Sequence, residues 1–432
     1  MTAIRSLETS RLSRRQFLKA GGATAGLVVL AACSKTGGTT AGGGGESGTL
    51  NALFMQQAAY STSDVQGMTK AFTTAYPKIK VNTTFVAYEA LHDKIVAAAP
   101  AGTYDIVLMD VIWPAEFGSK NEVVDVTKRF PSNWKTEIFP GALQTAEYNG
   151  HFYGVPWILD TKYFFYNKNM LDKAGAQPPT TWDEVVTVAK AVKSKAGVQY
   201  PLIWSWAQAE AVICDYAQLL GAFGGKFLDD SGAPAFNTGG GLQALEFMKQ
   251  TMAEGITNPA STESLEEDVR KILSSGQAAM ALNWTYMFSL ANDPKESKVP
   301  GQVAVAHTPA GPTGSAPGCN GSMALCIAAG SKNKDAAWKY IEFLTSQPIQ
   351  NQYAKLSLPI WESSYTDPAV VNTLPDVVAV AKTQLTDMIL RPQVPSYNQA
   401  SQIIQVAIQK ALTTSTTPKQ ALDDAAAQVA KL

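Results

Sequence analysis

The sequence predicts an α/β fold with two lobes, and three observations support this prediction. Roughly 380 of the 432 residues follow an N-terminal leader, which is more than one hydrophobic core usually organises. From residue 49 to residue 109, short apolar runs alternate with segments of helical periodicity in the order βαβαβ. After residue 180, segments of helical periodicity dominate, which predicts a helix-rich second lobe.

The strands of the first part are expected at three places. Residues 49–55 and 80–86 have the composition of strands, and the run 104–109 is apolar enough for a strand buried on both faces. Their alternation with helices implies an open parallel sheet covered by helices on both faces. Ligands of such sheets bind beyond the carboxyl ends of the strands, and Asp110 stands at one of these ends.

Helical periodicity marks the segments between and after these strands. Thr181, followed three residues later by Glu184, is typical of a helix N-terminus, because a threonine hydroxyl can accept from a free amide of the first turn. The expected helices span 63–75, 181–195, 241–254, 265–274, 333–345, 398–412 and 417–430.

The N-terminus has the organisation of an export signal. Basic residues including Arg14 and Arg15 precede a small, apolar run at 20–32, which is too short for an ordinary membrane-spanning helix. Residues 13–19 resemble a twin-arginine signal, and residues 30–33 resemble the lipobox of bacterial lipoproteins. We therefore expect a signal peptide at 1–32. The alternative is an N-terminal amphipathic helix with a chance arginine pair.

The lipobox resemblance implies that Cys33 becomes the lipidated first residue. Residues 33–48, with four consecutive glycines, would then form a flexible tether. The protein would be exported and anchored on the outer face of the bacterial cytoplasmic membrane.

Charge, cysteines and histidines exclude several classes of function. The formal charge is −1 and the leader is basic, so the remaining chain is mildly acidic and no nucleic-acid partner is expected. Cys214, Cys319 and Cys326 have no metal-ligand spacing, so neither a disulfide framework, a metal nor another cofactor is expected. The three histidines stand alone, without HExxH or GxSxG motifs, which argues against an enzyme. Paired carboxylates leave an exported glycoside hydrolase as the alternative.

Eight short motifs share an order and a spacing with one known family. They are found at 104–113, 153–157, 165–171, 178–184, 224–232, 276–284, 311–312 and 336–344, and include YDIVLMDVIW, YGVPW and GQAAMALNW. With them the chain resembles the extracellular solute-binding proteins of carbohydrate ABC importers, which include maltose- and trehalose-binding proteins.

The resemblance implies a class II periplasmic-binding-protein fold whose lobes are crossed several times by the chain. We place one lobe at 49–157 and 319–357 and the other at 158–318 and 358–432, with crossings near Leu159, Pro317 and Leu358. A monomer would capture a sugar, in the first place a di- or oligosaccharide, in the cleft and deliver it to separate permease and ATPase subunits. A polyol or another small polar solute is the alternative ligand.

Sugar sites combine carboxylates, which accept bonds from hydroxyl groups, with indoles that cover the C–H faces of the rings. Asp110 matches an acidic position of the family and is the first candidate acceptor, with a helix N-cap as the alternative role. Asp160 matches the family's second cleft carboxylate, with a hinge hydrogen bond as the alternative. Trp157 lies close to Asp160 in the sequence and is a further candidate.

Aromatic and basic candidates follow later in the chain. Trp284 matches the family's stacking platform, with core packing as the alternative. Trp204 and Trp206 alternate along an extended segment, so one is expected in the cleft and the other in the core. Arg391 matches an arginine that clamps disaccharide hydroxyls in relatives, with a surface ion pair as the alternative. Tyr397 is a weaker candidate.

Asn320, Gly321 and Ser322 stand where the family usually has Gly-Gly-Trp, so a stacking surface is lost and a hydroxyl is gained. This change favours a smaller or more polar solute. Further candidates follow the first two strands: Gln56, Gln57, Tyr60, Tyr88 and Glu89.

Overall fold

The computed structural model describes residues 47–56 and 59–432. The described residues all belong to one compact unit. The signal peptide, Cys33, most of the tether and Gln57 lie outside the described residues. In the described part of the chain, no helix combines the length and the apolar composition that a membrane crossing needs.

The first lobe is built on a five-stranded mixed sheet with the order β2-β1-β3-β12-β6. The three early strands are parallel, as the sequence predicts, whereas β12 runs antiparallel to both β3 and β6. The strands are β1 (Gly48–Met55), β2 (Ile79–Val86), β3 (Ile106–Asp110), β6 (Val155–Ile158) and β12 (Met323–Ile327).

Helices cover both faces of this sheet because the chain first steps outward from β1 to β2 and then returns across β1 to β3. Right-handed crossovers in opposite directions place α1 and α2 on opposite faces. A reciprocal capping box between Ser61 and Asp64 fixes the start of α1. The helices of this lobe are α1 (Thr62–Ala75), α2 (Tyr88–Ala98), η1 (Ala99–Ala101), α3 (Pro114–Ser119), α4 (Trp134–Glu137), α5 (Pro140–Leu143), α12 (Lys334–Thr345) and α13 (Gln347–Gln352). A hairpin of β4 (Glu147–Tyr148) and β5 (His151–Phe152) completes the lobe.

The second lobe is built on a four-stranded sheet with the order β10-β7-β9-β8 and is rich in helices, as predicted. Its strands are β7 (Tyr163–Asn167), β8 (Leu202–Ile203), β9 (Met280–Asn283) and β10 (Val303–Ala306). Its helices are α6 (Lys168–Ala174), α7 (Trp182–Ala191), η2 (Val192–Ala196), α8 (Glu210–Ala222), α9 (Gly239–Ala253), η3 (Pro259–Glu263), α10 (Glu266–Ser274), α11 (Tyr286–Ala291), α16 (Tyr397–Thr413) and α17 (Pro418–Val429). Thr181 caps α7 as expected, since its hydroxyl accepts from the amide of Glu184 at 3.2 Å.

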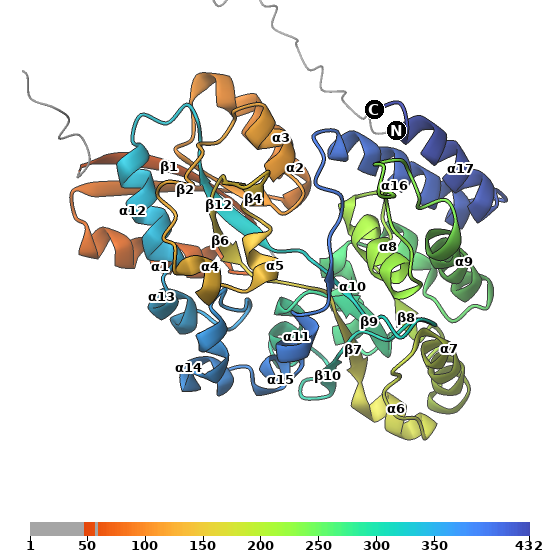
Figure 1. Cartoon of the computed structure of the whole chain (residues 1–432). Coiled ribbons are helices and arrows are strands. Elements are labelled where there is room, and N and C mark those ends of the chain that lie inside the picture. Colours follow the sequence, from red (N-terminus) through yellow and green to blue (C-terminus); the bar gives the residue numbers. More distant parts are fainter. Residues whose placement is uncertain (1–46, 57–58) are drawn as a thin grey trace, which may run out of the picture. The chain divides into compact units, whose positions relative to one another are not determined.

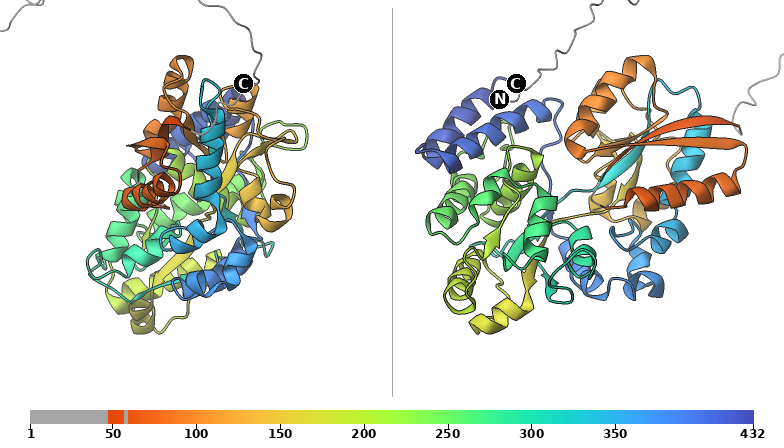
Figure 2. Two further views of the ribbon diagram at one scale, coloured as in Figure 1. Left: turned by 90° about the vertical axis from the view of Figure 1, so that its left-hand side faces the viewer. Right: turned by 180° about the vertical axis from the view of Figure 1, so that it is seen from behind.

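The two lobes lie side by side, and the last two helices, drawn in blue, pack against the helices of the second lobe (Figures 1 and 2). The buried apolar side chains form two clusters, the first of which extends into the second lobe with residues such as Phe165, Leu273 and Val303. The part of the chain between α13 and α16 carries η4 (Glu362–Thr366), α14 (Pro368–Val371) and α15 (Pro375–Gln384). This architecture confirms the predicted two-lobed α/β fold.

The segments that cross between the lobes pair with one another. The crossing at 159–162 joins β6 to β7, where Leu159 forms a bridge with Leu358 and Thr161 forms one with Asn320. Next to them, β11 (Gly318–Cys319) pairs in parallel with β13 (Met388–Ile389). The exact division of residues between the lobes stays a prediction.

Candidate ligand-binding pocket

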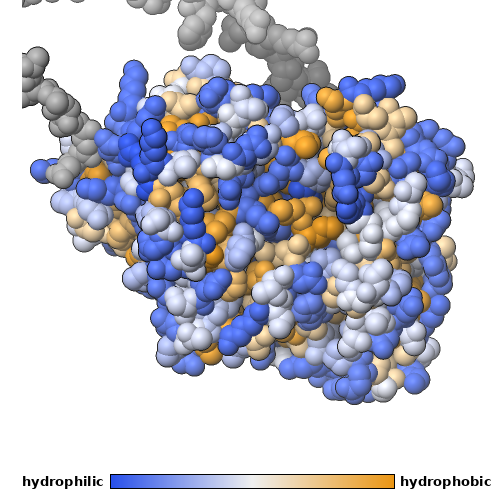
Figure 3. All heavy atoms as spheres, viewed as in Figure 1, coloured by the Kyte–Doolittle hydropathy of each residue, from blue (hydrophilic) through white to orange (hydrophobic). Residues whose placement is uncertain are grey.

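A pocket of about 270 Å³ lies between the lobes and is lined by both of them. On the face seen in Figure 3, hydrophobic side chains (orange) gather in the middle, while most of the surrounding surface is hydrophilic (blue). The charged groups of the lining are mostly acidic. They are Glu89, Asp110, Asp160, Glu210, Glu266, Glu267 and Asp268, against Lys271 and Arg391.

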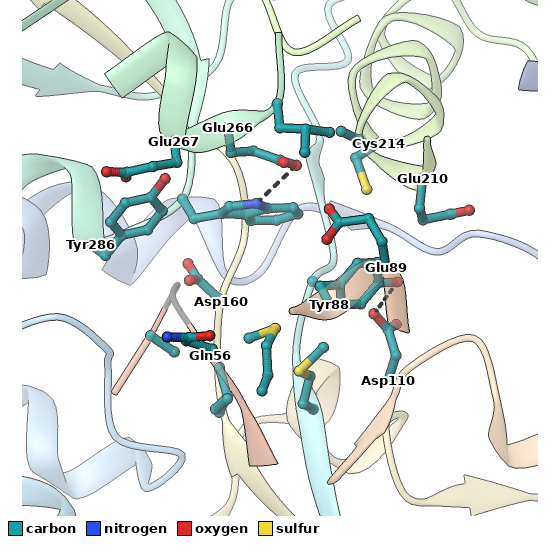
Figure 4. Close-up of a pocket in the computed structure, with 18 of the residues that line it drawn as sticks. Gln56, Tyr88, Glu89, Asp110, Asp160, Glu210, Cys214, Glu266, Glu267 and Tyr286 are labelled. Atoms are coloured by element: carbon teal, nitrogen blue, oxygen red, sulfur yellow. Dashed lines mark hydrogen bonds between the residues drawn. The ribbon is translucent and has the colours of Figure 1, made fainter. Parts of the chain in front are cut away.

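Asp110 lies at the carboxyl end of β3, and its two oxygens accept hydrogen bonds from different elements. Oδ1 accepts from the amide of Ile112 at 3.2 Å and from Nη2 of Arg391 at 3.2 Å. Oδ2 accepts from the hydroxyl of Tyr88 at 2.9 Å, which is one of the dashed lines in Figure 4. Burial, followed by the charges of Asp110 and Glu210, raises the pKa of Tyr88 well above its ordinary value, so this hydroxyl stays a donor.

Arg391 is buried and connects Asp110 of the first lobe to Glu210 of the second. Its Nη1 donates to Glu210 Oε1 at 2.7 Å, and its Nη2 also donates to the carbonyl of Asn320 at 3.2 Å. Glu210 accepts two further bonds of 2.5 Å, from the hydroxyls of Tyr397 and Ser401 on α16. The guanidinium and both carboxylates therefore form a network of their own at one end of the pocket.

Asp160 belongs to the first crossing segment and is 97% buried at the pocket wall. Its Oδ1 accepts from the amide and the hydroxyl of Thr285, at 3.1 and 2.7 Å, and from the amide of Thr161 at 2.9 Å. No donor among the described residues contacts Oδ2. Burial raises the pKa of Asp160 to about 7, although the hydrogen bonds from Thr285 and Thr161 favour the ionised form.

Trp284 directly follows β9, and its indole is half-buried at the pocket wall. Its Nε1 donates to Oε1 of Glu266 at 3.2 Å, and the ammonium of Lys162 lies 5.1 Å from the ring centroid. Gly321 lies against the six-membered ring, since a Cβ at this position would come within 2.4 Å of it. The ring is thus held by an acceptor, a buried cation and a close backbone approach.

Lys162 is itself fully buried directly behind the pocket. Its ammonium donates to Asp215 Oδ1 at 2.5 Å and to Ser205 at 2.8 Å, and it lies 3.5 Å from Glu266 Oε1. Burial lowers the pKa of Lys162, but the charges of Asp215 and Glu266 outweigh burial and raise it above its ordinary value. In the described part of the chain, no cluster of three or more histidines, cysteines or carboxylates is placed to hold a metal ion.

The arrangement suits a small molecule rich in hydroxyl groups. Residues 57–351 match the family model of the bacterial extracellular solute-binding proteins. The chain belongs to this family. Residues 11–31 also match the signal sequence of the twin-arginine translocation pathway, so the solute-binding protein carries an export signal.

Curated relatives cover most of this solute-binding protein. A probable ABC transporter-binding protein of Deinococcus radiodurans is 28% identical over 346 residues, which cover 77% of this chain and 81% of the relative. A mannitol-binding protein of Pseudomonas aeruginosa is 24% identical over 292 residues, which cover 66% of each chain. The protein is thus a binding protein of the ABC-transporter type and not an enzyme.

Solved structures share the fold over nearly their full lengths. Maltose-bound MalE3 of T. maritima superposes with a TM-score of 0.82 and 31% identity, covering 88% of this chain and 98% of that one. A ribitol complex of a solute-binding protein from Agrobacterium radiobacter K84 has a TM-score of 0.82 and 25% identity, covering 90% of this chain and 99% of that one.

The structure brings together most of the site residues that the sequence indicates for the solute-binding protein. The residues that line the pocket are Gln56, Tyr88, Glu89, Asp110, Asp160, Trp284, Gly321 and Arg391. The hinge hydrogen bond considered for Asp160 is present, because its carboxylate bonds to Thr285 across the crossing. Asp110 does not cap a helix: it accepts from the amide of Ile112 in the turn after β3, and the N-cap of α3 is Trp113. Arg391 forms buried rather than surface ion pairs.

Three of the expected indoles do not reach the pocket. Trp157 packs in the first core against Phe54 and Tyr60, with ring centroids 5.4 and 4.9 Å apart, and Tyr60 is buried with it. Trp204 and Trp206 both lie in the second core and stack at 5.7 Å with an interplanar angle of 10°. The expectation that one of them faces the cleft is wrong, because β8 ends at Ile203 and the strand alternation ends with it.

Two of the expected polar groups are engaged outside the pocket. The Ser322 hydroxyl accepts from the amide of Asp160 at 3.1 Å and lies 3.2 Å from its carbonyl, so it stabilises the crossing and offers the pocket no hydroxyl. Tyr397 is buried behind Glu210 and reaches the pocket only through that carboxylate.

The sequence interpretation missed the acidic residues of the second lobe. Glu210 begins α8, and Glu266, Glu267 and Asp268 form the first turn of α10. Acidic residues stabilise a helix N-terminus wherever the helix lies, so their presence at these helix starts did not indicate a pocket. The position of both helix starts at the cleft, visible in Figure 4, is a property of the fold.

Proposed function

We propose that this solute-binding protein captures a sugar or a sugar alcohol in the pocket between its lobes. The observation that carries the proposal is the indole of Trp284 at a pocket wall that also presents the buried carboxylate of Asp160. An indole covers the apolar C–H face of a sugar, and a carboxylate accepts from its hydroxyl groups. Solved relatives support this class, since they include complexes with maltose, ribitol and α-D-tagatose.

An amino acid is a less suitable ligand, although one relative is described as a probable amino-acid transporter component. An amino acid brings a carboxylate that needs a free cation. The guanidinium of Arg391 already binds Asp110 and Glu210, and the ammonium of Lys162 binds Asp215 away from the solvent. The ammonium of Lys271, which also lines the pocket, is exposed to solvent and lies 3.8 Å from Glu267. The acidic excess of the lining opposes a further negative charge.

Capture would feed an importer whose permease and ATPase are separate chains. Ligand contacts made by both lobes would favour the form in which the lobes meet, and the permease would recognise that form. We propose a division into 49–157 with 319–357 and 158–318 with 358–432, and a monomer. We also propose that Cys33 is lipidated and that residues 33–48 tether the protein to the outer face of the cytoplasmic membrane, because residues 30–33 resemble a lipobox.

A thermal-shift screen of residues 44–432 against sugars, sugar alcohols, amino acids and polyamines tests the proposal. A ligand at a thousandfold excess over Kd adds about 4 kcal/mol to the free energy of unfolding. We expect a shift with a sugar or a sugar alcohol that Trp284→Ala abolishes and that Trp206→Phe, a change in the core, leaves in place. A shift with amino acids or polyamines alone would contradict the carbohydrate assignment and leave the binding fold intact.

A further inference from the structure

The number of aromatic rings that can stack against a ligand limits the size of the ligand that the pocket can hold. All nine tryptophans lie within the described residues, and only Trp284 lines the pocket. Tyr286 is 96% buried. Tyr88 stacks on Trp113 at 6.1 Å with an interplanar angle of 12°, so one of its faces is already covered. The pocket therefore offers one indole face, which covers one sugar ring or one sugar-alcohol chain.

The polar groups at the other end of the pocket are already bonded to one another. Tyr88 donates to Asp110, and Arg391 joins Asp110 to Glu210. Glu210 is bonded in addition to Tyr397 and Ser401. A second sugar unit at this end would have to break buried, charge-assisted hydrogen bonds before forming its own. At the Trp284 end, in contrast, Asp160 Oδ2 meets no donor among the described residues.

The size of the cavity agrees with a pocket in which only the Trp284 end offers unbonded groups to a ligand. Its volume of about 270 Å³ lies just below the range of about 300–1,000 Å³ that is usual for drug-sized ligands. In Figure 4, Asp160, Gln56 and Tyr286 surround one part of the pocket, while Asp110 and Tyr88 stand together in another part.

We propose that the pocket binds a single sugar unit, either a monosaccharide or a sugar alcohol of similar length, and excludes disaccharides and longer chains. The inference rests on the proposed carbohydrate function and replaces the di- or oligosaccharide that the sequence resemblance implies. Its ligand contacts one face of the Trp284 ring and donates a hydroxyl to Asp160, and the network around Arg391 closes the far end.

Calorimetric titration of residues 44–432 with matched pairs of sugars tests the proposal. Each pair consists of a single sugar or sugar alcohol and a two-unit compound that contains it: glucose and maltose, glucitol and maltitol, galactose and melibiose, and mannose and mannobiose. For the pair that binds, we expect the single unit to bind at least tenfold tighter than the disaccharide. The Trp284→Ala variant should lose this binding, and the Trp206→Phe variant should retain it.

Two outcomes would overturn the proposal in different ways. Equal or tighter binding of the disaccharide would show a second sugar subsite, while the carbohydrate function itself would stand. No binding of any member of the four pairs, or of ribitol and α-D-tagatose, in a protein with an intact circular dichroism spectrum and cooperative unfolding, would remove the carbohydrate function and the single-unit inference together.

Discussion

Gly321 shows how a single residue shapes the pocket. Its Cα lies so close to the indole of Trp284 that a Cβ would meet ring carbons at 2.4 Å, well inside van der Waals contact. The sequence interpretation selected Gly321 because it belongs to the segment Asn320-Gly321-Ser322, which stands in place of the family's Gly-Gly-Trp. It could not show that the missing side chain makes room for an indole 37 residues away in the sequence.

The change Gly321→Ala should therefore displace the Trp284 ring and weaken ligand binding about 10- to 100-fold, which corresponds to about 1.4–2.8 kcal/mol. The measurement is the Kd of the wild-type protein and the variant. In a Trp284→Ala background the same change should have almost no further effect, because the ring it displaces is absent. Additive losses in the double variant would contradict this account.

Asp160 gives the protein a dependence of stability on pH. Its folded pKa of about 7 exceeds its ordinary value of 3.8 because the carboxyl is buried. Between these two pH values the folded chain holds a proton that the unfolded chain has released, so the free energy of unfolding falls as pH rises. The maximum slope is about 1.4 kcal/mol per pH unit.

The Asp160→Asn variant should lack this pH dependence, since the amide oxygen can still accept from Thr285 and carries no proton to lose. We expect the stability of the variant relative to the wild type to increase by about 2–3 kcal/mol between pH 5 and pH 8. Urea unfolding of both proteins at several pH values measures it. Parallel curves over this range would show that Asp160 does not titrate there.

At the scale of elements, local patterns predicted most strands and helices of the first half, whereas pairing partners needed the structure. The strand expected at 49–55 is β1 (Gly48–Met55), and the helix expected at 63–75 is α1 (Thr62–Ala75). The antiparallel strand β12 pairs with β3 although it follows β3 by more than 200 residues, and no local sequence pattern predicts this pairing. The alternation expected at Trp204 and Trp206 failed because β8 has only two residues.

The start of β7 is tied to α8 and α10 through the buried ammonium of Lys162. The change Lys162→Met leaves Asp215 buried without its cation, which typically costs about 3–5 kcal/mol. We expect urea denaturation to show this loss. The double variant Lys162→Met/Asp215→Leu, which removes both charges, should recover most of the stability. A single variant as stable as the wild type would mean that the ion pair contributes nothing.

At the scale of the whole molecule, the contacts between lobes join residues that are far apart in the sequence. Asp110 and Arg391 are 281 positions apart, and Asn398 of α16 contacts both Trp113 and Glu116 of the first lobe at 3.3 and 3.0 Å. The family resemblance indicated Asp110 and Arg391 as separate sugar ligands. Their mutual ion pair depends on how the lobes meet, so it could not be predicted from either position alone.

The network around Arg391 should stabilise the form in which the lobes meet. The change Arg391→Ala leaves Asp110 and Glu210 as two carboxylates without the cation between them, and their repulsion favours separation of the lobes. We expect a larger radius of gyration in small-angle X-ray scattering without ligand. If the population of the binding-competent form falls tenfold, Kd should rise about tenfold.

The matched control for this change is Arg270→Ala, which removes a cation that pairs with Glu267 and Glu296 within the second lobe. It should lower stability without changing the radius of gyration, because no bond between the lobes is lost. An unchanged radius in Arg391→Ala together with a raised Kd would show that Arg391 acts on the ligand directly, as the family resemblance implies. An increase in both quantities would show that its charge acts first on the two lobes.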